Sequence, residues 1–102
     1  MRSIRYSRTF HDELGELLEQ GIDRFGARVV AEKRDLVFRT IETKLVHQPV
    51  RSVDPDLGIC AYHVSRTPFV LLYDYDDAEL RIHIVMHASA DRTQIDLSAV
   101  VW

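Results

Sequence analysis

Two neighbouring stretches of helical periodicity, separated by a single glycine, constrain the fold of this chain most strongly. In the first, residues 10–25, apolar side chains recur every three or four positions, and Gly26 then provides a residue type that commonly closes helices. The second runs from about 27 to 48, where Pro49 ends it because proline cannot continue a helix. With so short a link, the two helices must form an antiparallel hairpin, and their apolar stripes need a sheet or a partner protein to cover them.

Short apolar segments on both sides of this hairpin predict strands. Residues 3–7 alternate between apolar and polar side chains, and a capping box of Thr9 and Asp12 predicts that the first helix starts directly afterwards. A loop rich in turn residues at 50–58 separates the hairpin from three further apolar runs. These runs are 59–64, 69–75 and 80–87, and the links between them are short enough for an antiparallel meander.

The last of the three runs predicts a strand with one buried face, because Ile82, Ile84 and Met86 alternate with other residues. Together with the first strand, the meander would form a three- to four-stranded, mainly antiparallel sheet with the helical hairpin on one face. A chain of 102 residues has the usual size of one domain and is too short for two. We therefore predict an α+β fold in which residues 1–102 form a single domain.

Composition and charge narrow the class of protein further. The chain is 46% hydrophobic and 28% charged, as globular proteins are. A single cysteine excludes an internal disulfide, and no apolar run reaches the roughly 18 residues that span a membrane, so we expect a cytoplasmic protein without a membrane anchor. The net charge is −3, whereas proteins that hold nucleic acid are usually basic on one face. We therefore predict no direct binding of nucleic acid by the chain alone.

Three groups of residues could carry chemistry, and each has a simpler interpretation. His83 and His87 share a strand, but neither a cysteine nor a carboxylate stands at the spacing that a zinc site needs. Cys60 lies in the middle of an apolar run, where free cysteine is usually an inert small hydrophobe. The acidic residues between 74 and 79 are more simply a solvated turn. We therefore predict no catalytic residue, no metal ligand and no cofactor.

The C-terminal segment, residues 94–102, is unusually apolar for a chain end and closes on Trp102. Tryptophan contributes strongly to protein interfaces, so this residue could contact a partner. Alternatively, the segment packs against its own domain as a last strand or turn. The sequence leaves both alternatives open.

The order of these elements, together with particular residues, resembles the RelE/ParE superfamily of toxins over nearly the whole chain. The residues that carry the resemblance are the opening 4–7 and 10–14, Phe25-Gly26 between the helices, 41–45 with Pro49 at the close of the second helix, and the strands 69–73 and 82–87. The resemblance implies the toxin half of a bacterial type II toxin–antitoxin pair. It also implies a cognate antitoxin of the ParD-like, ribbon-helix-helix type that binds the toxin tightly and neutralises it.

The RelE branch of this superfamily consists of ribosome-dependent mRNA endonucleases, whose fixed cations stabilise the extra negative charge of a phosphoryl group during cleavage. One of these cations is an arginine in a strand motif of the form Tyr-Arg-Leu-Val-Tyr. In this chain the matching segment is 69–73, and Val70 takes the place of the arginine. A RelE-like ribonuclease is therefore the alternative, and it would use Arg81, Arg92, Lys44 and His87.

The ParE branch lacks these ribonuclease residues and is associated with the poisoning of DNA gyrase. It often has a histidine at the end of the last core strand followed by arginines, which His87 and Arg92 match in part. The resemblance thus implies a ParE-like toxin and gyrase inhibitor, without chemistry of its own, that contacts its target through His87, Arg92 and Trp102. A toxin remnant that binds antitoxin without activity is a further alternative.

For the antitoxin we predict contacts on the second helix. Lys33, Leu36 and Arg39 combine an apolar side chain with two cations that suit the acidic tails of such antitoxins.

Overall fold

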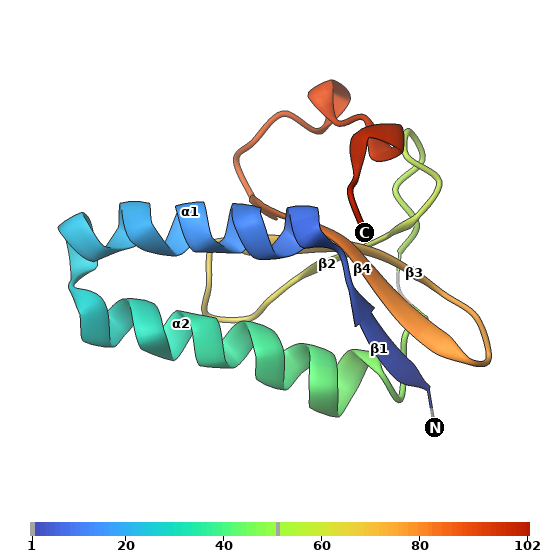
Figure 1. Ribbon diagram of the computed structural model, residues 1–102, viewed down its shortest axis with the longest axis horizontal. Helices are drawn as coiled ribbons and strands as arrows, with labels where there is room; N and C mark the ends of the chain where they lie inside the picture. The colour runs from blue at the N-terminus through green and yellow to red at the C-terminus, as the bar shows by residue number, and fades with distance from the viewer. Residues whose placement is uncertain (1, 51) are drawn as a thin grey trace.

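A computed structural model describes residues 2–50 and 52–102, so that residue 1 and residue 51 of the predicted loop 50–58 lie outside the described residues. In chain order the elements are β1 (Ser3–Tyr6), α1 (Arg8–Phe25), α2 (Ala27–Thr40), a π-helical turn (Ile41–Leu45), β2 (Cys60–His63), β3 (Phe69–Tyr75) and β4 (Glu79–His87). Two 3-10 turns, Arg92–Gln94 and Leu97–Ala99, follow in the C-terminal segment. Figure 1 shows α1 and α2 as a long hairpin beside the sheet.

The four strands form one sheet in the order β1-β4-β3-β2. The strands β2, β3 and β4 make the antiparallel meander that the sequence predicts, and β1 joins the other side of β4 in parallel. Tyr6 pairs with Ile82 at the end of β1, so the chain enters α1 next to the middle of β4. The predicted α+β architecture of a hairpin on a mainly antiparallel sheet is confirmed.

The start of α1 differs from the prediction. Ser7 caps the helix, because its hydroxyl oxygen accepts a hydrogen bond of 2.8 Å from the backbone N–H of Phe10. The same hydroxyl donates to the backbone carbonyl of His83 at 2.6 Å and is fully buried. The capping box predicted from Thr9 and Asp12 is therefore wrong, since the helix begins earlier, where a buried serine can join it to β4.

The second helix continues beyond α2 as the π-helical turn Ile41–Leu45, so its predicted extent of 27–48 is too long at the C-terminal end by three residues. Ile41 and Leu45 lie at the two ends of this turn, and both are fully buried. A π-helical turn carries one more residue than an α-turn, which rotates the side chains that follow it. Here it keeps both apolar residues on the face that packs against the sheet.

Two apolar layers cover the two faces of the sheet. The main core lies between the sheet and the helices and includes the fully buried Phe10, Val37, Ile41, Leu71 and Tyr73. A second, smaller core lies on the opposite face. It consists of Val70, Leu72, Ile84 and Met86, covered by Leu57, Ile59, Ala61, Ile95, Leu97 and Val100.

A β-bulge in β4 distributes its residues between the two cores. The register passes from Leu72 opposite Ile84 to Tyr73 opposite Ile82, so His83 has no partner across the strand pair. Such an extra residue interrupts the alternation of faces. Ile82 consequently belongs to the main core, while Ile84 and Met86 belong to the second. The prediction that all three share one buried face is wrong for this reason.

The C-terminal segment packs against its own chain as turns rather than as a strand. Its apolar side chains cover the second core, and the backbone carbonyl of Val101 accepts hydrogen bonds from the N–H groups of Arg8 and Thr9 at 2.7 and 3.2 Å. In Figure 1 the last residues, drawn in red, end close to the start of α1. None of the helices in the described part of the chain has the length and hydropathy to span a membrane.

Candidate functional site

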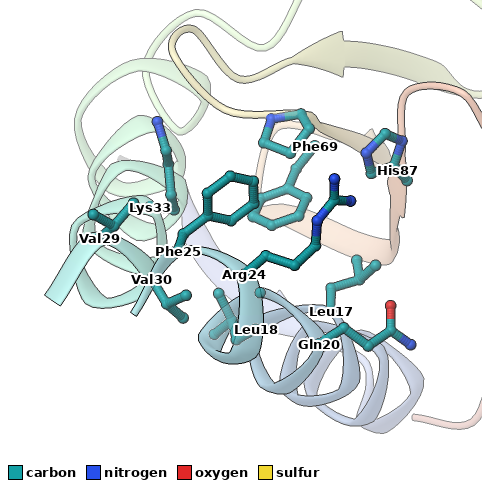
Figure 2. Close-up of a pocket in the computed structure, with 12 residues that line it drawn as sticks. Leu17, Leu18, Gln20, Arg24, Phe25, Val29, Val30, Lys33, Phe69 and His87 are labelled. Atoms are coloured by element: carbon teal, nitrogen blue, oxygen red, sulfur yellow. The ribbon is translucent and has the colours of Figure 1, made fainter. Parts of the chain in front are cut away.

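A groove of about 430 Å³ opens where the far end of the helical hairpin extends past the sheet. Its apolar walls come from three places: the last turns of α1, the first turns of α2, and the start of β3. The apolar residues that define it are Leu17, Leu18, Phe25, Val29, Val30 and Phe69. Figure 2 shows Phe25 in the middle of this groove, with Phe69 behind it and Leu17 and Leu18 below. We call this hollow the hairpin groove.

The hairpin groove exists because the apolar stripes of the helices are longer than the sheet they cover. Phe25 is 61% exposed and Val29 is 38% exposed, although both continue the apolar stripes that bury Leu14 and Val37 further along. At the sheet edge of the groove, Phe69 and His87 lie opposite each other as the last pair of β3 and β4. Uncovered apolar side chains in a hollow of this kind are typical of a binding surface.

The charged side chains that line the hairpin groove are basic. Arg24 and Lys33 line it, and among the described residues no aspartate or glutamate does. The Arg24 side chain extends across the groove in Figure 2, with its guanidinium toward the Phe69 and His87 side. The ammonium group of Lys33 donates a hydrogen bond to the backbone carbonyl of Arg66. The electrostatics of this surface therefore favour a ligand that combines apolar and acidic groups.

The residues predicted to contact the antitoxin separate into two groups in the structure. Lys33 lines the hairpin groove. Leu36 is half-buried at the margin of the main core, and Arg39 is exposed further along α2. Only the first of the three therefore belongs to the groove, since a rise of about 1.5 Å per helical residue places the others progressively farther from it.

The residues predicted to contact the target do not form one cluster. His87 lies at the hairpin groove, where its Nδ1 accepts a hydrogen bond from the backbone N–H of Ser89 at 3.1 Å. Arg92 pairs with the buried carboxylate of Asp54 at 3.1 Å. Trp102 lies beside the middle of β4, where its ring is 4.8 Å from the ring of His83.

The cations of the alternative, RelE-like set are also dispersed. Arg81 lies six residues along β4 from His87, and its guanidinium pairs with Asp74, Asp76 and Glu79 at 2.9 to 3.1 Å. Hydrogen bonds from Arg81 and from two backbone N–H groups lower the pKa of Asp76 to about 2, so this carboxylate stays charged beside the guanidinium. Because three carboxylates neutralise the charge of this guanidinium, it would stabilise the negative charge of a phosphoryl group only weakly.

Lys44 and Val70 complete the positions compared with the RelE branch. The ammonium group of Lys44 donates a hydrogen bond of 2.8 Å to the phenol oxygen of Tyr62 on the edge strand β2, which β3 separates from the strand of Arg81. Val70 is 2% exposed and belongs to the second core, beneath the C-terminal segment. The position that carries a catalytic arginine in the RelE branch is therefore a packing position here.

Sequence reasoning missed most of the hairpin groove. Leu17, Phe25 and Phe69 belong to apolar patterns that predict a core, and a pattern does not reveal where the covering sheet ends. The available signal was the continuation of the apolar stripe past the glycine link, from Phe25 to Val29 and Val30. This continuation makes the hairpin longer than a small sheet can cover.

No family model and no curated protein matches this chain. Among solved structures, the chain is similar to a chain of the structure described as the chromosomal ParDE TA system from P. aeruginosa, with 16% sequence identity and a TM-score of 0.70. The similarity covers 85% of this chain and 96% of that one. At this identity the likeness concerns the fold, and it confirms the architecture expected from the RelE/ParE resemblance. This chain therefore has a fold that occurs in a ParDE toxin–antitoxin system.

Proposed function

We propose that this chain is the toxin of a type II toxin–antitoxin system, that a ParD-like antitoxin neutralises it by binding tightly, and that it inhibits DNA gyrase. The observation that carries the proposal is the hairpin groove, an uncovered apolar surface lined by cations on a fold that occurs in a ParDE system. A monomer rarely leaves such a surface open unless a partner covers it. The proposal places the protein in the cytoplasm, where gyrase acts.

The shape and charge of the hairpin groove suit an amphipathic, acidic segment of an antitoxin. Apolar side chains of such a segment would contact Phe25 and Phe69, and its carboxylates would lie near Arg24 and Lys33. Leu36 and Arg39 lie further along α2 and would contact the same partner if its segment follows the helix. Electrostatic complementarity of this kind favours one partner and speeds association.

The arrangement of the cations favours target binding over RNA cleavage. Phosphoryl transfer needs several free cations at one point, and losing a single donor commonly costs about a hundredfold in rate. Arg81, Arg92 and Lys44 instead pair with other side chains at three separate places. A gyrase inhibitor needs only a complementary surface, for which His87, Arg92 and Trp102 remain the proposed contacts.

One preparation of antitoxin-free protein can test the mechanism. We expect it to inhibit supercoiling by purified DNA gyrase while leaving mRNA intact in a translation extract. Cleavage of mRNA with gyrase unaffected would instead establish the RelE-like ribonuclease. If expression of the chain does not inhibit cell growth and neither assay shows an effect, the chain is an inactive toxin fold that binds antitoxin.

A further inference from the structure

Residues 91–102 cross the outer face of the sheet and are attached at both ends, and we call them the C-terminal strap. At its start, Arg92 forms an ion pair of 3.1 Å with Asp54. At its end, the Val101 carbonyl accepts hydrogen bonds from the first N–H groups of α1, and the Val101 N–H donates to the Thr9 hydroxyl at 2.8 Å. Figure 1 shows this return of the strap to the beginning of α1. The strap thus joins the outer sheet face to a helix of the opposite layer.

A hollow of about 410 Å³ lies between α1, β4 and the strap. Glu13 lines it from the helix, Ile84 and Met86 line it from the strand, and Asp91 and Asp96 line it from the strap. No lysine, arginine or histidine is among the described residues that line it. Three carboxyl groups therefore share one hollow without a cation to balance them.

Of the three carboxyl groups in the hollow, Glu13 is the one whose surroundings stabilise a negative charge least. Its Oε1 atom is buried, with no hydrogen-bond partner among the described residues. Burial and, to a smaller extent, the neighbouring charge of Glu16 raise the pKa of Glu13 to about 7. The folded surroundings of Glu13, of which the strap forms one wall, therefore favour the neutral form of this carboxyl group over the charged one.

Two further carboxyl groups line the same hollow from the strap. On the strap, the Thr93 hydroxyl donates to Asp91 and the Ser98 hydroxyl donates to Asp96, which lowers the pKa of both carboxyls and keeps them ionised near neutral pH. From β4 only the apolar Ile84 and Met86 line the hollow. Ionisation of Glu13 therefore adds a third negative charge to a hollow whose lining already carries two near neutral pH.

We propose that Glu13 makes the C-terminal strap a pH-sensitive cover, which lies on α1 while this carboxyl group is neutral and detaches from the helix when it ionises. Because the packed state raises the pKa of Glu13, the contribution of this group to packing is present in full below about 4.5 and is lost as the pH rises through about 7. Detachment uncovers Ile84 and Met86 of the second core. The strap thereby covers this apolar surface of the sheet while Glu13 is neutral and exposes it when Glu13 is ionised.

Trp102, the only tryptophan of the chain, reports on the strap directly. Its ring is 40% exposed and lies 4.9 Å from the guanidinium of Arg5 while the strap is in place. Quenching of its fluorescence by acrylamide, measured on the full chain across neutral pH, follows the accessibility of this ring. We expect the quenching constant to rise about two-fold with a midpoint near pH 7, as the strap opens locally while the domain stays folded.

Three variants assign the transition to its cause. Glu13→Gln cannot ionise and should abolish the transition. Glu16→Gln, at an exposed position one turn along the same helix, should retain the transition and move its midpoint to lower pH, because the charge of Glu16 helps to raise the pKa of Glu13. His83→Gln should also retain the transition, which excludes titration of the histidine that contacts the Trp102 ring. The proposal is overturned if the wild-type chain shows no transition, if Glu13→Gln still shows one, or if His83→Gln abolishes it.

Discussion

A Cβ atom placed on Gly21 would lie 3.1 Å from Cγ2 of Val30, so α1 and α2 approach each other at the hairpin groove more closely than most residues permit. The contact sets the separation of the two helices just where their apolar side chains become uncovered. A larger residue at this position must push the helices apart or displace Val30. Gly21 therefore permits a close approach of the two helices beside the groove.

Gly21→Leu should lower the stability of the chain by about 1–3 kcal/mol, the usual cost of overpacking. Gly15→Leu provides a matched control, because it lies in the same helix and a Cβ there meets nothing within 4 Å. This control should stabilise the chain by up to about 1 kcal/mol, since leucine favours a helix more than glycine does. Thermal unfolding of both variants measures the difference, and equal effects would show that the helices do not meet closely at Gly21.

Ile41→Asp and Leu17→Asp should behave differently, although both positions belong to apolar helical stripes. Ile41 is fully buried in the main core, where an unpaired charge costs several kcal/mol, so this variant should lose its thermal transition. Leu17 is only half-buried and lines the hairpin groove, where water can hydrate the new carboxylate. Its variant should retain a native transition, and loss of that transition would place Leu17 in the core instead.

Arg81→Gln should change the acid stability of the chain. Partial burial raises the pKa of Asp74, but hydrogen bonds from Arg81 and His83 outweigh this effect and lower it. A hydrogen bond from Arg81 also contributes to lowering the pKa of Asp76 to about 2. A carboxyl group whose pKa is lowered in the folded state stabilises the fold above its ordinary pKa of 3.8. That stability is lost as the pH falls to about 2.

Chemical unfolding at several pH values tests this prediction. The variant should be less stable than the wild-type chain near neutral pH and should converge with it near pH 2. Arg28→Gln is the control, because the Arg28 side chain is 94% exposed and its ion pair with Glu32 is long, at 3.8 Å. A constant difference between Arg81→Gln and wild type at every pH would contradict the assignment.

The elements of the fold follow from local patterns and could be predicted. Continuous apolar residues between turns predict β3 at 69–75, and the structure has Phe69–Tyr75. The bulge at His83 could not be predicted, because apolar and other residues alternate regularly along the sequence of β4. Only the pairing of β4 with β3 shows that His83 has no partner across this strand pair. The cap at Ser7 was missed for a similar reason, since its second hydrogen bond joins it to His83, 76 residues away.

The candidate site was less predictable than the fold. Lys33 was chosen for its charge and His87 for its match to a histidine of the ParE branch, and the structure brings both to the hairpin groove. Phe25 and Phe69 were missed, because a sequence pattern marks a residue as apolar without showing whether anything covers it. Trp102 could not be placed either, since its position depends on contacts with His83 and with Arg5, which lies near the opposite end of the sequence.

The central claim, that an acidic antitoxin binds in the hairpin groove, is tested most directly by the dissociation constant of the purified chain and its ParD-like antitoxin. Lys33→Glu combined with Arg24→Glu reverses two charges that line the groove and should weaken binding at least about tenfold, or about 1.4 kcal/mol. Arg28→Glu reverses a charge on the same hairpin outside the groove and should leave the dissociation constant unchanged. Equal affinity of all three proteins, or no binding by the wild-type chain, would contradict the account.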